Sequence, residues 1–289
     1  MRLSHESKTR LAVGGTAIAL IAILVAALSS CQFRLLNNDT ESTVAQWGDW
    51  DEAGIEYDGK ATVLSKATFD AKDVQALDLD VDSGDVDVAL IDGDAVTVVE
   101  KGRVAKGVEA KDAKVKGLIE LDGSTLKVCK AKARDKQATD RTITIGLPRD
   151  LAARLMSVRV SAGSGDVSLT GVTCEVLDSS IGSGDFSFKG TAAKTLKAQI
   201  GSGDAEFVLD SAPSQSMDIQ GGSGDAYVEV PHDAGFSAEV SLGSGDFSSD
   251  FLDDDLDGFE ISSKTFKNGD GSATFRFNVG SGDMTLSAR

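Results

Sequence analysis

Recurring aspartates are the residues of this sequence best placed to do chemistry. Each ends a tetrapeptide, Gly-Ser-Gly-Asp, that occurs six times, and a variant, Asp82-Ser83-Gly84-Asp85, lies far upstream. Carboxylate oxygens are the ligands that calcium prefers, whereas in a turn the same carboxylate accepts hydrogen bonds from backbone N–H groups. The weak calcium candidates are Asp166, Asp185, Asp204, Asp225 and Asp246.

The spacing of the tetrapeptides bears on both roles. The steps between their first glycines are 19, 19, 21, 21 and 37 residues. If the tetrapeptides stack in register, neighbouring carboxylates lie about 4.8 Å apart and repel by about 1 kcal/mol in water, so backbone N–H groups or a bound cation must compensate. One tetrapeptide in ~20 residues supplies few ligands compared with tandem calcium-binding repeats. The turn role is therefore favoured and no cofactor is predicted, with an acidic calcium-binding β-roll-like module as an alternative.

Other catalytic groups are scarce. Of the two histidines, His5 precedes an apolar segment and His232 follows a proline. The tetrapeptide differs from the G-x-S-x-G nucleophile elbow, and no lysine follows it as in a phosphate-binding loop. We predict that the protein is not an enzyme. The enzyme class left open is a glycan-active β-helix that uses a pair of carboxylates.

The three cysteines suggest two further kinds of chemistry. Leu28-Ser29-Ser30-Cys31 resembles a bacterial lipobox, in which the thiol of the cysteine takes a lipid, so Cys31 is a lipidation candidate. Cys129 and Cys174 are candidates for a disulfide, which export would permit, and buried free thiols are the alternative. No cysteine and histidine spacing indicates zinc.

The N-terminal region predicts attachment to a membrane. Leu11–Leu28 is apolar and long enough to approach a bilayer span, and its basic flank places the N-terminus in the cytoplasm. Residues 1–31 are therefore a signal anchor or a lipoprotein signal, with cleavage and release as a third possibility. Residues 32–60 are polar and predict a stalk. The bulk of the chain is expected outside the cytoplasm.

The residues around each tetrapeptide predict strands. Apolar residues alternate with polar ones after the aspartate, as in Phe186-Ser-Phe188, and before the first glycine, as in Met156–Val160 and Phe275–Val279. Each unit thus consists of strand, glycine corner and strand, and residues 61–289 form an all-β domain whose regular array covers 156–289. The predicted structural corners are Gly163, Gly165, Gly182, Gly184, Gly201, Gly203, Gly222, Gly224, Gly243, Gly245, Gly280 and Gly282.

Recurrence of one corner in every unit favours coils of a β-solenoid, because the hairpins of a sandwich or barrel would place alternate corners at opposite ends. The final corner lies close to the C-terminus, so the last strand is expected to close the array. The net charge of −17 argues against nucleic acid as a partner. A basic stretch between Glu100 and Arg141 contrasts with the acidic array.

The serial corners, together with Thr142–Asp150 leading into Val158–Asp166, resemble the bacterial "putative adhesin" β-strand-repeat family of unknown function. The resemblance covers roughly Val74 to Arg289. It implies a right-handed solenoid with a single strand on each face, preceded by an N-terminal hydrophobic helix, and a non-enzymatic surface or scaffold role. Envelope proteins or glycans are then the expected partners, and the family offers no catalytic residues to transfer.

Overall fold

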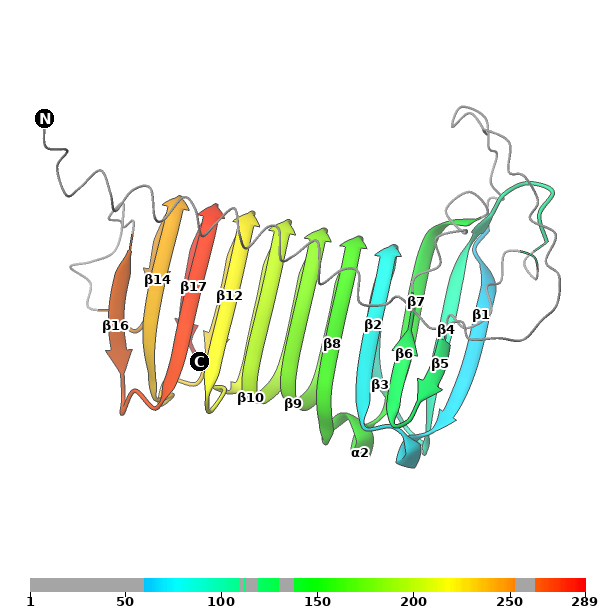
Figure 1. Ribbon diagram of the computed structural model, residues 1–289, viewed down its shortest axis with the longest axis horizontal. Coiled ribbons are helices and arrows are strands. Elements are labelled where there is room, and N and C mark those ends of the chain that lie inside the picture. The colour runs from blue at the N-terminus through cyan, green and yellow to red at the C-terminus, as the bar shows by residue number, and fades with distance from the viewer. Residues whose placement is uncertain (1–59, 110–111, 113–118, 130–137, 253–262) are drawn as a thin grey trace, which may run out of the picture. The chain divides into compact units, whose positions relative to one another are not determined.

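The computed structural model describes residues 60–109, 112, 119–129, 138–252 and 263–289, and these are almost entirely β-structure. Their strands join into one sheet that folds over on itself, as Figure 1 shows. The helical elements among them are a single turn of 3-10 helix, η1 (Ala71–Asp73), and a short α-helix, α2 (Arg149–Ala152). The described part of the chain is therefore all-β and built like a solenoid.

Two long strands show how one coil is made. β9 (Val167–Ser183) and β10 (Phe186–Ser202) run parallel in register from Val167↔Phe186 to Ser183↔Ser202. The register shifts between Lys189 and Thr195, where each strand bends from one face of the structure to the other. A coil thus contains a strand after the corner, a bend, and a strand that returns to the next corner.

Face A contains the strands that precede each corner, and all of its neighbouring strands are hydrogen-bonded. In spatial order it consists of β5 (Ile119–Asp122), β6 (Thr125–Val128), β2 (Ala76–Ser83), β8 (Leu155–Ser164), the second halves of β9 and β10, β12 (Ser216–Ser223), β17 (Ala273–Ser281), β14 (Phe236–Ser244) and β16 (Lys264–Asn268). Figure 1 shows this face toward the viewer.

Face B contains the strands that follow each corner. In the same direction it consists of β1 (Thr62–Asp70), β4 (Ala95–Val104), β7 (Ala138–Pro148), β3 (Asp85–Ile91), the first halves of β9 and β10, β11 (Ala205–Ser211), β13 (Ala226–Val230), β18 (Met284–Ala288) and β15 (Phe247–Ser249). The hydrophobic core lies between the two faces, because the inward residue of each alternating pair is buried.

The C-terminal coil corrects one expectation from the sequence. The prediction that the last strand closes the array is wrong, because β17 lies between β12 and β14 and β18 lies between β13 and β15. β16, joined to β17 by a tight turn, pairs antiparallel with the opposite side of β14. β14 therefore lies between β16 and β17. The stacking order of the coils differs from their order in the sequence.

The N-terminal end is also assembled out of order. The variant corner at Asp82–Asp85 joins β2 to β3, and these strands stack on β8 and β9. Asp85 of this corner and Asp166 of the corner on which it stacks are 81 positions apart by subtraction. β7 runs parallel to β3 on its other side, and β4 and β1 follow antiparallel. Between β4 and β7 the buried Arg141 Nε lies 3.2 Å from Oε1 of the buried Glu100, so these two charges neutralise each other at this end.

Two sequence expectations for individual regions need comment. Met156 is 55% exposed, and the adjacent Leu155 is buried instead, so the expected alternation in β8 begins only at Val158. The N-terminal segment 1–31, with Cys31, and nearly all of the predicted stalk lie outside the described residues. Among the described residues, no helix has the length and apolar character needed to cross a bilayer.

Candidate functional site: the aspartate ladder and the groove beside it

Glycine is required at both positions of the corner because successive corners touch through their backbones. The second glycine of the tetrapeptide has a positive φ, +122° at Gly184, which L-residues rarely adopt. A Cβ on Gly184 would lie 2.3 Å from the carbonyl oxygen of Gly165, and one on Gly182 would lie 2.5 Å from that of Gly163. The predicted corner glycines therefore stack directly above one another, without room for side chains.

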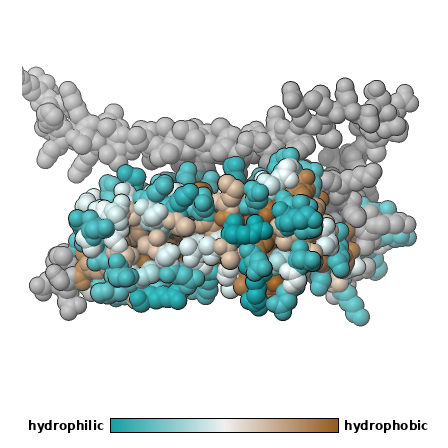
Figure 2. All heavy atoms as spheres, turned by 90° about the horizontal axis from the view of Figure 1, so that it is seen from below, coloured by the Kyte–Doolittle hydropathy of each residue, from teal (hydrophilic) through white to brown (hydrophobic). Residues whose placement is uncertain are grey.

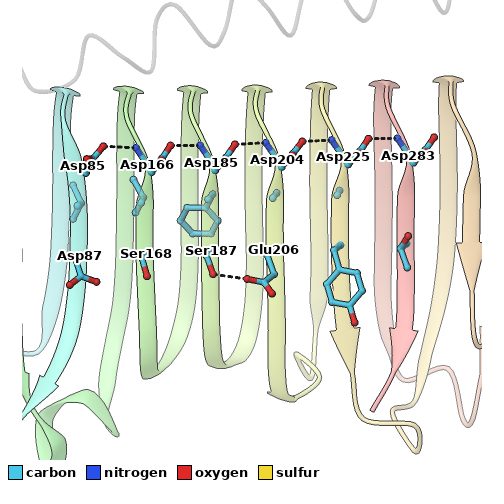
Figure 3. A pocket seen from close by; sticks show the side chains of 17 residues that line it. Asp85, Asp87, Asp166, Ser168, Asp185, Ser187, Asp204, Glu206, Asp225 and Asp283 are labelled. Carbon is cyan, nitrogen blue, oxygen red and sulfur yellow. Dashed lines mark hydrogen bonds between the residues drawn. The ribbon is translucent and has the colours of Figure 1, made fainter. Parts of the chain in front are cut away.

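The aspartates that follow these glycines form a hydrogen-bonded column, which we call the aspartate ladder. In each step, Oδ1 of one aspartate accepts a hydrogen bond from the backbone N–H of the aspartate in the next coil, at 2.8–3.1 Å. Figure 3 shows these bonds as dashed lines for the first six members. In spatial order the ladder consists of Asp85, Asp166, Asp185, Asp204, Asp225, Asp283 and Asp246.

The direction of the backbone explains why the corner needs a side-chain acceptor oxygen. The residue after each aspartate donates its N–H forward, as Phe186 does to the carbonyl oxygen of Asp204 at 2.9 Å. The N–H of Asp204 points backward, toward Asp185, whose side-chain oxygen accepts it. The carboxylate thus replaces a main-chain acceptor at the corner, and the N–H dipole offsets part of the repulsion between neighbouring charges.

All five weak calcium candidates belong to this ladder, but they are not gathered around a common point. Each coil contributes one carboxylate, and Asp283 separates Asp225 from Asp246. Within the described parts of the chain, no group of three or more acidic, histidine or cysteine side chains is arranged to hold a metal ion. Instead, the carboxylates accept backbone N–H groups of the neighbouring coil.

A shallow groove of about 750 Å³ runs beside the ladder on the outer side of face B. Figure 3 shows the ladder along one margin and a row of outward side chains below it. That row contains one residue from each coil and forms the groove's polar lining: Asp87, Ser168, Ser187, Glu206, Tyr227 and Thr285. The groove therefore crosses six coils and presents carboxylates, hydroxyls and one aromatic ring to solvent.

Neighbouring coils fix the orientation of the polar groups in the groove. Glu206 accepts a hydrogen bond from Ser187 at 2.9 Å and pairs with Lys189 at 3.0 Å. The hydrogen bond from Lys189 is the main reason why the pKa of Glu206 lies below its ordinary value. The hydroxyl of Tyr227 donates to Glu229 at 2.9 Å, and this bond raises the pKa of the phenol. Hydrogen bonds thus orient Ser187, Glu206 and Tyr227 within the groove.

Figure 2 shows the molecule from below, at the end of the coils opposite the ladder. Hydrophilic residues cover much of this side, and hydrophobic residues lie between them. In the described part of the chain, the large hydrophobic residues that are exposed are Val63, Met156 and Val176. The groove beside the ladder is a candidate binding surface among the described residues.

The candidate disulfide between Cys129 and Cys174 is not formed in this structure. Cys174 lies in β9 and is buried, and this burial raises its pKa to about 12. Cys129 follows β6 and is only partly buried. Because the reactive species of a cysteine is the thiolate, Cys174 is an inert core residue at neutral pH. The lipidation candidate Cys31 lies outside the described residues.

The sequence analysis missed two features of this site. Asp85 and Asp283 were not among the calcium candidates, although both occupy the ladder; their Ser-Gly-Asp sequences were the available signal. The groove itself was also missed. The residues two positions after each aspartate, such as Glu206 and Tyr227, appear in the sequence only as the polar members of an alternating pattern.

The chain belongs to the Toastrack DUF4097 family, whose model matches residues 68–287. A solved structure from Clostridium sporogenes, described as a "putative cell adhesion protein", shares 10% identity and a TM-score of 0.42; the match covers 80% of this chain and 100% of that one. A "putative adhesin" from Bacteroides fragilis shares 16% identity and a TM-score of 0.39, over 81% and 100% of the two chains. No curated protein matched the chain.

Proposed function

We propose that this protein is a non-enzymatic, adhesin-like module that is tethered to a membrane and binds another component of the cell envelope outside the cytoplasm. Its coils would wind right-handedly, and the hydrophobic segment Leu11–Leu28 would form an N-terminal helix in the bilayer. That segment and its basic flank support the tether. The tether is either the helix itself or a lipid on Cys31.

The observation that carries the binding role is the groove across six coils, with its row of polar side chains. A repeating surface of this kind suits an extended partner, because each coil offers an equivalent contact about 4.8 Å from the next. Envelope proteins and glycan chains are both extended polymers of repeating polar groups. The ladder carboxylates are engaged by backbone N–H groups, which favours a structural role for them over catalysis.

Site-specific photo-crosslinking in living cells tests the binding role. A photoreactive residue is introduced at Thr285 in the groove or, as a matched control, at Gln199 on the outer side of face A, in the full-length chain. We expect discrete high-mass adducts from the groove position and none from the control position. Equal labelling at both positions, or labelling at neither, contradicts the proposal.

Cell fractionation tests the tether and the location separately. We expect the full-length chain in the membrane fraction, with the array digested when protease is added outside the cytoplasmic membrane. Labelling with a fatty acid distinguishes the two kinds of tether: a label that is lost when Cys31 is substituted by serine indicates a lipid, and no label on the wild-type chain indicates an anchor helix. Recovery of the wild-type chain in the cytosol would contradict membrane attachment.

A further inference from the structure

The outer side of face A carries a row of charges whose sign alternates from strand to strand. The strand registers place each member opposite the next. From β5 to β14 the row is Glu120, Lys127, Asp78, Arg159, Asp178, Lys197, Asp218, Arg276 and Glu239. Opposite charges directly across neighbouring strands stabilise a pairing, and like charges destabilise it.

This alternation depends on the displaced C-terminal coil. Arg276 in β17 lies between Asp218 in β12 and Glu239 in β14, and its Nε approaches Oε2 of Glu239 to 3.8 Å. If the coils stacked in chain order, the corners at Gly222 and Gly243 would be neighbours, and the same register would place Asp218 beside Glu239. Chain order therefore creates a like-charge pair that the observed order avoids.

Backbone contacts at the corners do not distinguish chain order from the observed order, because every corner offers the same contacts. Gly224 donates to the carbonyl oxygen of Ser281, just as Gly203 donates to that of Ser223, each at 3.1 Å. The neighbouring row of uncharged residues does not select an order either, because Gln220, Asn278 and Ser241 create no like-charge pair in whichever order they stack. Side chains must therefore distinguish the C-terminal coil from the other coils. Charge is one side-chain property that differs with order, beside aromatic contacts such as that between Phe236 and Phe275.

We infer that the gap between β12–β13 and β14–β15 is a binding site for β17 and β18 of the C-terminal segment Lys264–Arg289, selected through Arg276, and that these strands of a second copy of the chain can fill it. The segment follows β14 and β15 in the sequence, so it reaches the gap only after both walls have been synthesised. Charge complementarity identifies the occupant: an arginine between two carboxylates. Two chains that exchange these segments form a reciprocal dimer.

Complementary full-length variants test the exchange. One chain carries R276E, and the other carries D218S/E239K, in which serine avoids a new clash with Lys197. Each chain alone places a like-charge contact in its own gap. Exchange between the two restores the native row at one gap and forms an introduced carboxylate–lysine pair at the other. The two chains bear different affinity tags, are co-expressed, and are purified on both tags in succession.

We expect the complementary pair to yield at least about fivefold more mixed dimer than two differently tagged wild-type chains. The matched control replaces R276E with K267E, which reverses an exposed charge in the same segment but outside the row. The inference is overturned if the complementary pair yields no more mixed dimer than the K267E pair.

A second measurement keeps the inference testable if the reversed variants fold poorly. R276Q removes the charge and retains a long polar side chain, whereas R276E adds repulsion from Asp218 and Glu239. We expect the urea midpoint to fall further for R276E than for R276Q, and to recover in the single-chain variant D218S/R276E/E239K. Equal midpoints for R276Q and R276E would show that packing alone, and not the charge, seats this coil.

Discussion

The central coils and the C-terminal coil use the same tetrapeptide but reach their places in different ways. The coils that begin at Gly163, Gly182, Gly201 and Gly222 stack in the order in which they are synthesised. The C-terminal coil, with its corner at Gly280, enters between two coils that precede it in the chain. Identical corners therefore allow coils to stack, but they do not determine the order in which the coils stack.

This difference separates the interactions that build the array from those that arrange it. The corner supplies generic contacts: glycines that permit close approach and a carboxylate that accepts one backbone N–H. The faces supply particular contacts, such as the stacked rings of Phe236 and Phe275, whose centroids are 4.4 Å apart, and the pairing of Arg276 with Glu239. Substitutions at corners should weaken any coil alike, whereas substitutions on the faces should affect particular neighbours.

The largest effect is expected from Gly184→Ala in the central region. The new Cβ meets the Gly165 carbonyl oxygen at 2.3 Å with φ at +122°, so we expect a loss of about 2–4 kcal/mol in the free energy of unfolding. Gly93→Ala is the control, because its φ is also positive but nothing lies within 4 Å of the new Cβ. Urea denaturation measures both variants, and similar losses would show that strain, not stacking, explains the glycines.

A smaller effect is expected from Asp185→Ala, which leaves the N–H of Asp204 without its acceptor. We expect a loss of about 0.5–1.5 kcal/mol in the free energy of unfolding. Asp185→Asn retains an acceptor oxygen and removes a like charge from the ladder, so it should be at least as stable as the wild type at low salt. The reverse order of these two variants in urea would contradict the acceptor role.

At the end of the ladder the same substitution should matter less. Asp246 donates its N–H to Asp283, but its neighbour β16 runs antiparallel and presents no further corner to its carboxylate. Asp246→Ala should therefore lower the urea midpoint by less than Asp185→Ala does. Equal losses for the two variants would mean that the carboxylates stabilise their own corners rather than the next coil.

Acid should loosen the C-terminal coil before β8 and β9. Asp250 accepts hydrogen bonds from Ser287 and the Ala288 N–H, and Asp270 accepts one from the Ser272 N–H; these bonds lower the pKa of both carboxyls. A lowered pKa contributes stability that is complete above the ordinary value of 3.8 and is lost as the pH falls through the folded-state value. Protection from hydrogen exchange below pH 4 should therefore fall first in β17 and β18. Earlier loss of protection in β8 and β9 would contradict this reading.

Calcium should produce the smallest effect. Every ladder carboxylate except that of Asp246 already accepts a backbone N–H, and the carboxylates are arranged one to a coil rather than around one point. We expect millimolar calcium to leave the melting temperature of the full-length chain unchanged. A rise of several degrees that magnesium does not reproduce would instead favour the calcium-binding alternative.

The sequence was sufficient to predict the coil but not the complete order of the coils. Period-2 alternation around Phe186 and Phe188 indicated strands, and the recurring glycines indicated stacked corners, because both signals depend on nearby residues. The placement of Arg276 between Asp218 and Glu239 depends on which distant strands become neighbours, and identical corners hide that choice. The alternating charges were present in the sequence, but they form a pattern only after the register is known.

The groove was beyond prediction for a related reason. Glu206 and Tyr227 are 21 residues apart by subtraction and share no motif, and only the coil period brings them to one surface. The disulfide suggested for Cys129 and Cys174 rested on the predicted export of the chain, and it is not formed in the structure. Contacts that depend on one coil were therefore accessible from the sequence, and contacts that depend on several coils were not.

Disulfide trapping of the corner serines measures the order of the coils most directly. Ser281 pairs with both Ser223 and Ser244 in the observed register, so Ser223 and Ser244 are two strands apart. A disulfide requires Cα atoms within about 7 Å, which neighbouring strands satisfy and strands two apart do not. In full-length chains oxidised and mapped by mass spectrometry, we expect a crosslink in S223C/S281C and none in S223C/S244C. A crosslink in S223C/S244C alone would show that the coils stack in chain order and would contradict the inserted C-terminal coil.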